Sequence, residues 1–231
     1  MDERLNIGVV IVAGGNGKRM GGAIPKQFRI VCGMPLLART ITTFAEALPA
    51  AERVVVLPEQ YISFWRDLSA RFNVPPHKVV AGGSERFHSV KAGIGALSES
   101  VKYIAVHDGV RSLCSKRLII RVLQCAMENG AAVPCIEPAD SLRMVAGDAS
   151  HILDRSAIRI VQTPQIFSAA ILRDAYNADY DPSFTDDASV AEHSGTVVTL
   201  CEGERSNIKI TTPEDIIIAR ALLAGDEESE E

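Results

Sequence analysis

Small and charged residues cluster directly after a short apolar run near the start of the chain. The run Ile7–Val12 leads into AGGNGKRM at positions 13–20 and then into PKQ at positions 25–27. Glycines allow backbone N–H groups to approach phosphate oxygens, and Arg19 and Lys26 place positive charge beside the same loop. The pattern predicts a phosphate-binding loop after a buried strand, although a purely structural turn would also use such glycines.

The loop matches neither of two common nucleotide-binding motifs. The dinucleotide motif GxGxxG needs a third glycine where this chain has Met20. The P-loop needs Ser or Thr after Gly17-Lys18, where this chain has Arg19. We therefore expect a nucleotide site of another kind, and an NAD-dependent dehydrogenase is disfavoured.

A second cluster, GGSERFHS at positions 82–89, follows the apolar run 78–81. Ser84 is suited to cap the helix that begins here. Arg86 and Ser89 would lie on its first turn, from which they could reach a base or a phosphate.

A third cluster, VHDGVR at positions 106–111, ends another apolar run. Asp108 would stand at the carboxyl end of a buried strand, where a single carboxylate can hold Mg²⁺ together with substrate phosphates and water. A turn-forming aspartate is the alternative. We expect His107 to be structural, because its spacing recruits no Ser or Cys nucleophile.

The later polar clusters are weak signals taken singly. Thr185, in TDDAS at positions 185–189, is interpreted as a helix N-cap, and Arg155 as a surface charge. Lys209 lies between Ile208 and Ile210, an unusual place for a lysine in a short apolar strand.

The elements that must position these residues alternate along the chain. Strands are expected at 7–12, 53–57, 78–81 and 103–106, and helices at 36–47, 60–71, about 86–97, 116–129 and 213–223. This alternation predicts an α/β fold with a mostly parallel sheet and helices on both faces.

Residues 139–161 interrupt the alternation. Short strand-like pieces at 141–145, 151–153 and 158–161 surround the turn 146–148, which predicts an inserted hairpin arm. Such an arm has little core of its own, so we expect it to pack against a second subunit. We expect one domain over residues 1–224 and a disordered acidic tail over residues 225–231.

Composition narrows the class of protein. A chain of 231 residues with 47% apolar residues can bury a substantial core, and its net charge of −5 disfavours general attraction to nucleic acid or an anionic membrane. The five cysteines lack disulfide or metal-site spacing, which favours a reducing cytoplasm. The first apolar run is too short to span a bilayer.

Taken in order, AGGNGKRM, PKQF, GGSER, VHDGVR, LDR, TPQ, TDDAS and NIKIT resemble the 2-C-methyl-D-erythritol 4-phosphate cytidylyltransferase family over residues 7 to about 220. The resemblance implies a Rossmann-like domain of the nucleotide-diphospho-sugar transferase type, with a β-hairpin arm that interlocks a homodimer. It also implies an enzyme that joins a polyol phosphate to CTP, releases pyrophosphate, and uses Mg²⁺ or another divalent cation.

The same resemblance implies roles for individual residues. Arg19 and Lys26 match residues that stabilise the charged transition state, and Arg155 and Lys209 match residues that position the polyol phosphate. Asp108 matches the acid that binds Mg²⁺ and contacts the ribose. The other matches are Ala13, Gly14, Gly15, Gly17, Gly82, Ser84, Arg86, Ser89 and Gly109 for the nucleotide, and Arg111, Thr163 and Thr185 for the substrate.

Several positions depart from the family pattern. Ser84 and Ser206 stand where aspartate is common, and Gly109-Val110 and Ser112 replace Ala-Ala and Pro. A ribitol 5-phosphate cytidylyltransferase, which performs the same chemistry on another polyol phosphate, stays open because likeness of fold cannot fix the substrate. A non-catalytic nucleotide-binding regulator is a further alternative, disfavoured because the charged residues of the motifs are all present.

The charges of the glycine-rich loop generate a first prediction. Replacing Arg19 or Lys26 with alanine should lower kcat more than it raises KM for CTP, because negative charge reorganises at the α-phosphate during the reaction. We expect a loss of about 10² to 10³ in steady-state kcat for each variant. An unchanged kcat in both would refute the assignment.

Overall fold

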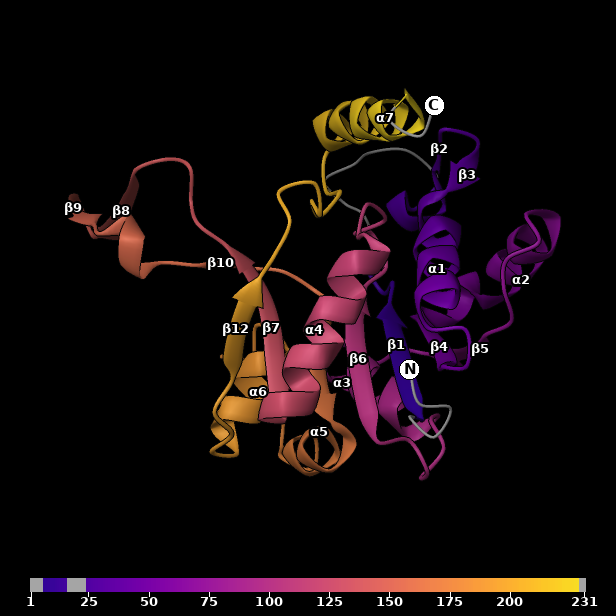
Figure 1. The fold of residues 1–231 in the computed structure, drawn as a ribbon, viewed down its shortest axis with the longest axis horizontal. Coiled ribbons are helices and arrows are strands. Elements are labelled where there is room, and N and C mark those ends of the chain that lie inside the picture. Colours follow the sequence, from indigo (N-terminus) through magenta and orange to yellow (C-terminus); the bar gives the residue numbers. More distant parts are fainter. Residues whose placement is uncertain (1–5, 16–23, 229–231) are drawn as a thin grey trace.

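The computed structural model describes residues 6–15 and 24–228, and its centre is an eight-stranded sheet (Figure 1). Seven strands follow the order β10-β7-β11-β6-β1-β4-β5, and β12 also pairs with β7. The strands are β1 (Ile7–Val12), β4 (Glu52–Leu57), β5 (Lys78–Ala81), β6 (Tyr103–Asp108), β7 (Ala131–Ile136), β10 (Ile160–Val161), β11 (Gln165–Ser168) and β12 (Thr199–Glu202).

Strand β1 lies between β6 and β4 and runs parallel to both, and β5 continues the parallel half. Its residues are apolar throughout because helices cover both faces of the sheet. Parallel strands end at one edge, so the loops after β1, β5 and β6 are neighbours. Backbone hydrogen bonds hold two of these loops to the adjacent strands: Ala13 N donates to Val56 O in β4 at 2.9 Å, and Gly109 N donates to Val12 O in β1 at 2.8 Å.

The helices form a layer on each face of the sheet (Figure 1). One layer contains α1 (Leu36–Ala47), α2 (Ile62–Arg71) and α4 (Lys116–Asn129); the other contains α3 (Arg86–Gly95), α5 (Ala169–Ala175) and α6 (Asp187–His193). The last helix, α7 (Pro213–Glu228), packs beside a small hairpin formed by β2 (Ile30–Val31) and β3 (Met34–Pro35). The predicted mostly parallel α/β fold is confirmed.

The inserted hairpin is present and stands apart from the sheet (Figure 1). It pairs β8 (Leu142–Ala146) with β9 (Ala149–Leu153) in antiparallel fashion, and Gly147 turns between them with φ 59°. The strand-like piece predicted at 158–161 is not part of the arm. Its last two residues form β10, which pairs with β7 at the edge of the main sheet.

The prediction of a disordered tail over residues 225–231 is also wrong in part. Helix α7 continues to Glu228, so the first four residues of the expected disordered tail are helical. Among the described residues, no helix is long and apolar enough to cross a membrane.

Candidate active site

Two adjoining cavities open at the edge where β1, β5 and β6 end. The glycine-loop cavity has a volume of about 300 Å³ and is lined by Val12, Ala13, Gly14, Gly15, Lys26, Gln27, Gly83, Ser84, Glu85, Arg86, Ser89, Asp108, Val110 and Lys209. The threonine cavity has a volume of about 230 Å³ and is lined by Arg86, Asp108, Arg111, Val161, Gln162, Thr163, Gln165, Thr185, Asp186 and Lys209. Both cavities therefore share Arg86, Asp108 and Lys209.

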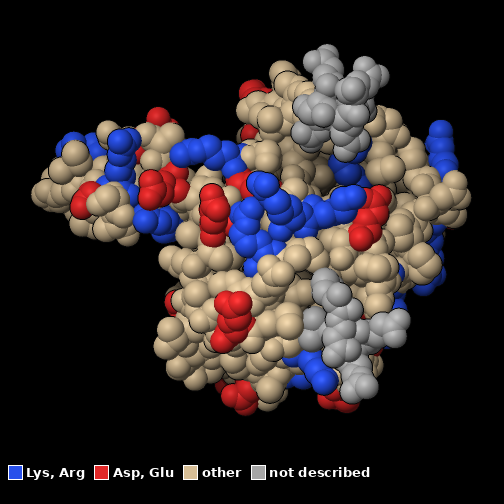
Figure 2. Space-filling view, in the orientation of Figure 1, with Lys and Arg blue, Asp and Glu red and all other residues tan. Residues whose placement is uncertain are grey.

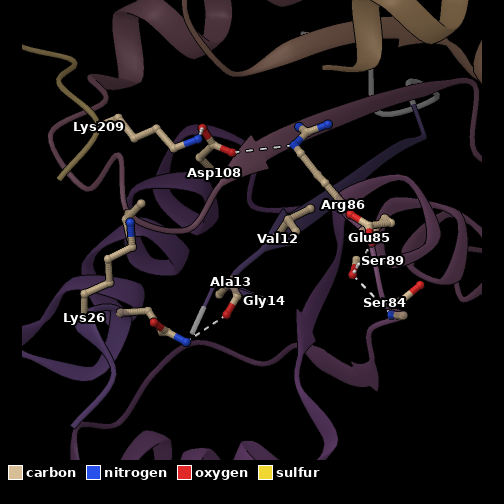
Figure 3. Close-up of a pocket in the computed structure, with 14 residues that line it drawn as sticks. Val12, Ala13, Gly14, Lys26, Ser84, Glu85, Arg86, Ser89, Asp108 and Lys209 are labelled. Atoms are coloured by element: carbon tan, nitrogen blue, oxygen red, sulfur yellow. Dashed lines mark hydrogen bonds and ion pairs between the residues drawn. The ribbon is translucent and has the colours of Figure 1, made fainter. Parts of the chain in front are cut away.

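Asp108 lies at the junction, almost fully buried at the end of β6. Its Oδ2 atom is 3.0 Å from Lys209 Nζ and 3.4 Å from Arg111 Nε, and its Oδ1 atom is 3.9 Å from Arg86 Nε. Lys209 and Arg86 approach it from opposite sides (Figure 3). Burial alone would raise the pKa of Asp108, but the three cations lower it well below its usual range. The carboxylate is therefore ionised at every physiological pH.

The segment that carries Lys209 is tied to the end of β6 by buried hydrogen bonds. Arg111 Nη1 donates to Asn207 O at 2.8 Å, and Asn207 Nδ2 donates to Thr163 O at 2.9 Å. Ile210 N donates to Val110 O at 3.1 Å. These bonds explain the unusual position of Lys209, because the chain there passes over the site as an irregular segment and not as the expected strand.

Thr163 is hydrogen-bonded to the backbone of Asp108. Its Oγ1 accepts from Asp108 N at 3.1 Å and lies 3.1 Å from His107 Nδ1. His107 Nε2 lies 3.2 Å from Arg111 O, which can only accept, so the proton belongs on Nε2 and Thr163 donates to Nδ1. Burial lowers the pKa of His107 to about 4. The neutral, hydrogen-bonded ring agrees with the structural role expected for it.

The second loop is shaped by Ser89, whose hydroxyl is already engaged. Ser89 Oγ accepts from Gly83 N at 3.2 Å and donates to Glu85 O at 3.1 Å. A Cβ atom on Gly82 would lie 2.6 Å from Ser89 Oγ, so this position needs glycine. The hydroxyl of Ser89 thus shapes the loop, and because Ser89 also lines the glycine-loop cavity, its contact with a ligand stays a prediction. Ser84 does not cap α3; it lies 3.2 Å from His88 Nδ1.

Arg86 lines both cavities, and each of its terminal nitrogens already donates one N–H to a buried carboxylate. Nη1 and Nη2 donate to the two carboxylate oxygens of Asp187 at 2.9 and 2.6 Å. Burial alone would lower the pKa of Arg86, but Asp187 raises it well above the usual arginine value. Arg86 therefore presents a fixed charge to both cavities, and its contact with a base or phosphate stays a prediction.

Lys26 begins η2 (Lys26–Phe28), a short helical turn anchored to the core. Phe28 is buried and stacks on Trp65 with ring centroids 5.8 Å apart. Gln27 is 1% exposed, and its Nε2 donates to Ala13 O at 2.9 Å. Its Oε1 has no hydrogen-bond partner in the described part of the chain. Gln27 belongs to the PKQ motif but is not among the site residues predicted from the sequence.

The other expected site residues differ in their placement. Gly17 and Arg19 lie outside the described residues. Thr185 lines the threonine cavity but does not cap α6; Asp186 does, by accepting from Ser189 N at 2.9 Å. Gly109 lines neither cavity. Its Cα faces the core, where an added Cβ would lie 3.0 Å from Ala13 Cβ and from Leu37 Cδ1.

Arg155 is not brought to the cavities of its own chain. It lies on η4 (Arg155–Ala157) after the hairpin, where its Nη1 donates to Ala139 O at 2.8 Å. The side chain is exposed, and the arm carries charges of both signs (Figure 2).

The chemistry of the cavities is that of a site for polyanions. Lys and Arg outnumber Asp and Glu in the walls of the two cavities: Lys26, Arg86, Arg111 and Lys209 against Glu85, Asp108 and Asp186. Lys and Arg also gather across the middle of the face drawn in Figure 2, despite the negative net charge. Two adjacent anionic groups could therefore be held side by side, with Asp108 and Lys209 between them.

The burial of His107 generates a prediction about pH. Its pKa is lowered from 6.5 to about 4, so the stability that this group contributes is complete above pH 6.5 and is lost as pH falls towards 4. The loss should be about 3 kcal/mol in the free energy of unfolding. His107→Gln removes the titrating ring, and urea titrations of both proteins between pH 4 and pH 7 measure the difference.

Other titrating groups also bear on this prediction. Burial also lowers the pKa of His77, so only the difference between wild type and variant reports on His107. The pKa values of Asp108 and Glu52 are lowered from 3.8 and 4.5, so their contributions begin to fall at the acidic end of the window, but both groups are present in both proteins. Identical pH dependence in the two proteins would refute the buried neutral ring.

Comparisons with known proteins agree with this chemistry. The model of the family described as 2-C-methyl-D-erythritol 4-phosphate cytidylyltransferase matches residues 7–225. Curated relatives with that name include one from Bacteroides fragilis, 42% identical over 93% of this chain and 98% of its own, and one from Porphyromonas gingivalis, 44% identical over 93% and 96%.

Solved structures extend the comparison. The Thermus thermophilus 2-C-methyl-D-erythritol 4-phosphate cytidylyltransferase superposes with a TM-score of 0.72 at 34% identity, covering 93% of this chain and 97% of its own. The Anaerococcus prevotii 4-diphosphocytidyl-2C-methyl-D-erythritol synthase gives a TM-score of 0.82 at 26% identity, covering 96% and 100%. Residues of the matching motifs line both cavities. The chain belongs to the 2-C-methyl-D-erythritol 4-phosphate cytidylyltransferase family.

Proposed function

We propose that this protein transfers the cytidylyl group of CTP to 2-C-methyl-D-erythritol 4-phosphate in isoprenoid precursor biosynthesis. The products are 4-diphosphocytidyl-2-C-methyl-D-erythritol and pyrophosphate. The observation that carries the proposal is the pair of cavities sharing Asp108, Arg86 and Lys209, since the reaction needs two anionic substrates in contact. The glycine-loop cavity takes CTP and the threonine cavity takes the polyol phosphate.

The reaction is an in-line displacement at phosphorus. An oxygen of the phosphate monoester forms a bond to the α-phosphorus of CTP, while the bond from that phosphorus to the oxygen bridging to the β-phosphate breaks and pyrophosphate leaves. The monoester is largely dianionic near neutral pH, so no general base is required. Positioning and electrostatic stabilisation supply the catalysis, because the two polyanions repel each other.

Each charged side chain has a role that follows from its position. Lys26, together with Arg19, acts on the phosphates of CTP, and Lys209 lies where the two cavities join and neutralises both reacting groups. Arg111 orients Asp108 and holds the Lys209 segment through Asn207. The five cysteines are all free thiols, which fits work in a reducing cytoplasm.

Asp108 fits a divalent cation that arrives with the nucleotide. The described residues contain no group of three His, Cys, Asp or Glu side chains suited to a metal, but Asp108 offers one ionised carboxylate where phosphates are expected. Mg²⁺ commonly takes one or two carboxylates and completes its shell with water and phosphate oxygens. When bound, it would neutralise charge on the triphosphate.

Asp108→Asn should therefore lose most Mg²⁺-dependent turnover, by at least about 10²-fold, since the amide keeps the shape and removes the charge. Glu85→Gln is the matched control, because Glu85 lines the same cavity but is exposed. It should keep near wild-type turnover and Mg²⁺ dependence. Full wild-type activity in excess EDTA would contradict the metal requirement.

The arm supports a second part of the proposal, a homodimer with a composite site. Three apolar arm residues are strongly exposed: Met144 by 52%, Val145 by 74% and Ile152 by 73%. A second copy of the chain would cover them and would receive Arg155 over its threonine cavity. Arg155 then acts on the polyol phosphate across the interface.

Subunit mixing tests the composite site. Arg155→Ala and Lys26→Ala chains, each nearly inactive, should form heterodimers with one intact site, restoring about a quarter of wild-type activity at full random exchange. A mixture of Lys26→Ala and Lys209→Ala chains should stay inactive, since both lysines line one cavity of the same chain. If the first mixture also stays inactive despite proven exchange, Arg155 does not act across the interface.

A pyrophosphate-release assay tests the function itself. With CTP, we expect turnover of 2-C-methyl-D-erythritol 4-phosphate to exceed that of ribitol 5-phosphate. The reverse preference would identify the alternative substrate. Nucleotide binding without turnover of either polyol phosphate would identify a regulator.

A further inference from the structure

Asp187 has no role in the reaction described above, yet its Oδ2 atom lies only 2.6 Å from Arg86 Nη2. It is fully buried at the first position of α6 and lines neither cavity. Both of its oxygens accept from Arg86, and Tyr176 Oη also donates to Oδ1 at 2.7 Å. The carboxylate is thus fully committed to protein partners.

Arg86 depends on this partner for its orientation. It is the first residue of α3, where the helix dipole disfavours a cation, and it has no acidic neighbour in that turn. Its side chain is 27% exposed, and its Nε edge faces Asp108. Because the planar guanidinium is held at two points, the pair fixes the rotation of the group as well as its place.

The start of α6, which carries Asp187, is also held in place. Gln165 on β11 accepts from Ala188 N at 2.9 Å and donates to Asp186 at 2.8 Å, which fastens the start of α6 to the sheet. The N-terminal dipole of a helix favours a carboxylate at this position. Phe87 stacks on Tyr176 at 4.9 Å, so the residues beside Arg86 and Asp187 pack together as well.

We propose that Asp187 is a positioning residue that holds Arg86 as a fixed charge in the wall shared by the CTP and polyol phosphate cavities. The inference rests on the proposed function, which assigns those substrates to the two cavities. Without the Asp187 charge, the nearest carboxylate for the guanidinium of Arg86 is Asp108. Arg86 would then turn towards Asp108, and both cavities would lose the shape and charge of their common wall.

The test is Asp187→Asn, which keeps the size of the side chain and removes its charge. KM for CTP and KM for the polyol phosphate should both rise by about tenfold, and the calorimetric Kd for CTP should rise with them. A merely structural defect would lower the active fraction, and so kcat, with KM and Kd unchanged. Asp187→Glu, which restores the charge, should recover at least part of the lost affinity.

Two controls separate the ion pair from its surroundings. Tyr176→Phe removes the other hydrogen bond to Asp187 and leaves the contact with Arg86, so KM should stay near wild type. In an Arg86→Gln background, Asp187→Asn should cause no further rise in KM or Kd, and this neutral pair also avoids an unpaired buried charge. Wild-type turnover, measured in parallel, tests the proposed function by itself.

The proposal is overturned if Asp187→Asn leaves both KM values and the Kd for CTP unchanged. It is also overturned if the same rise occurs in the Arg86→Gln background, since Asp187 would then act through another group. If the wild-type enzyme turned over neither polyol phosphate, the calorimetric Kd for CTP would still decide the role of Asp187.

Discussion

The buried carboxylate of Asp108 is the constraint around which the site is arranged. An ion at the end of a central strand loses most of its hydration, and such a charge is tolerated only when cations compensate it. Here they come from three separate elements: Arg86 from the start of α3, Arg111 from the loop after β6, and Lys209 from the segment before α7. The Asp108 carboxylate thus holds together parts of the chain that lie about a hundred residues apart in the sequence.

The same electrostatics leads from fold to function. Parallel strands deliver the loops after β1, β5 and β6 to one edge, and backbone hydrogen bonds between neighbouring strands and loops lock them there. Groups held in this way need little reorganisation when charged ligands bind. A preorganised cluster with excess positive charge suits a reaction that brings two polyanions together, whereas a hydride or acyl transfer would make little use of it.

Much of this could be predicted because its signals are local. The apolar run of β1, the Gly130 end of α4 and the place of Asp108 at a strand end follow from periodicity, turn chemistry and the general behaviour of parallel sheets. The contact of Asp187 could not be predicted from such local signals. Its partner Arg86 is 101 residues away, and an aspartate at the start of a short helix has the same local pattern whether it binds an arginine or water.

Other misses have similar causes. The bonds of the Ser89 hydroxyl to Gly83 and Glu85 could not be predicted, because only the folded loop brings these groups together. Strand β10 was assigned to the arm because two residues carry no sign of which sheet they join. The helical continuation of α7 past Leu223 likewise lacked a sequence signal, since acidic residues are as common in solvated helices as in disordered tails.

The most direct measurement of the central claim is a crystal structure with Mg²⁺, a non-hydrolysable CTP analogue and 2-C-methyl-D-erythritol 4-phosphate bound together. The triphosphate should occupy the glycine-loop cavity and the monoester the threonine cavity, with Lys209 contacting both. A monoester oxygen should lie about 3 to 3.5 Å from the α-phosphorus, in line with the leaving oxygen. A nucleotide outside the glycine-loop cavity, or a monoester remote from Asp108 and Lys209, would contradict it.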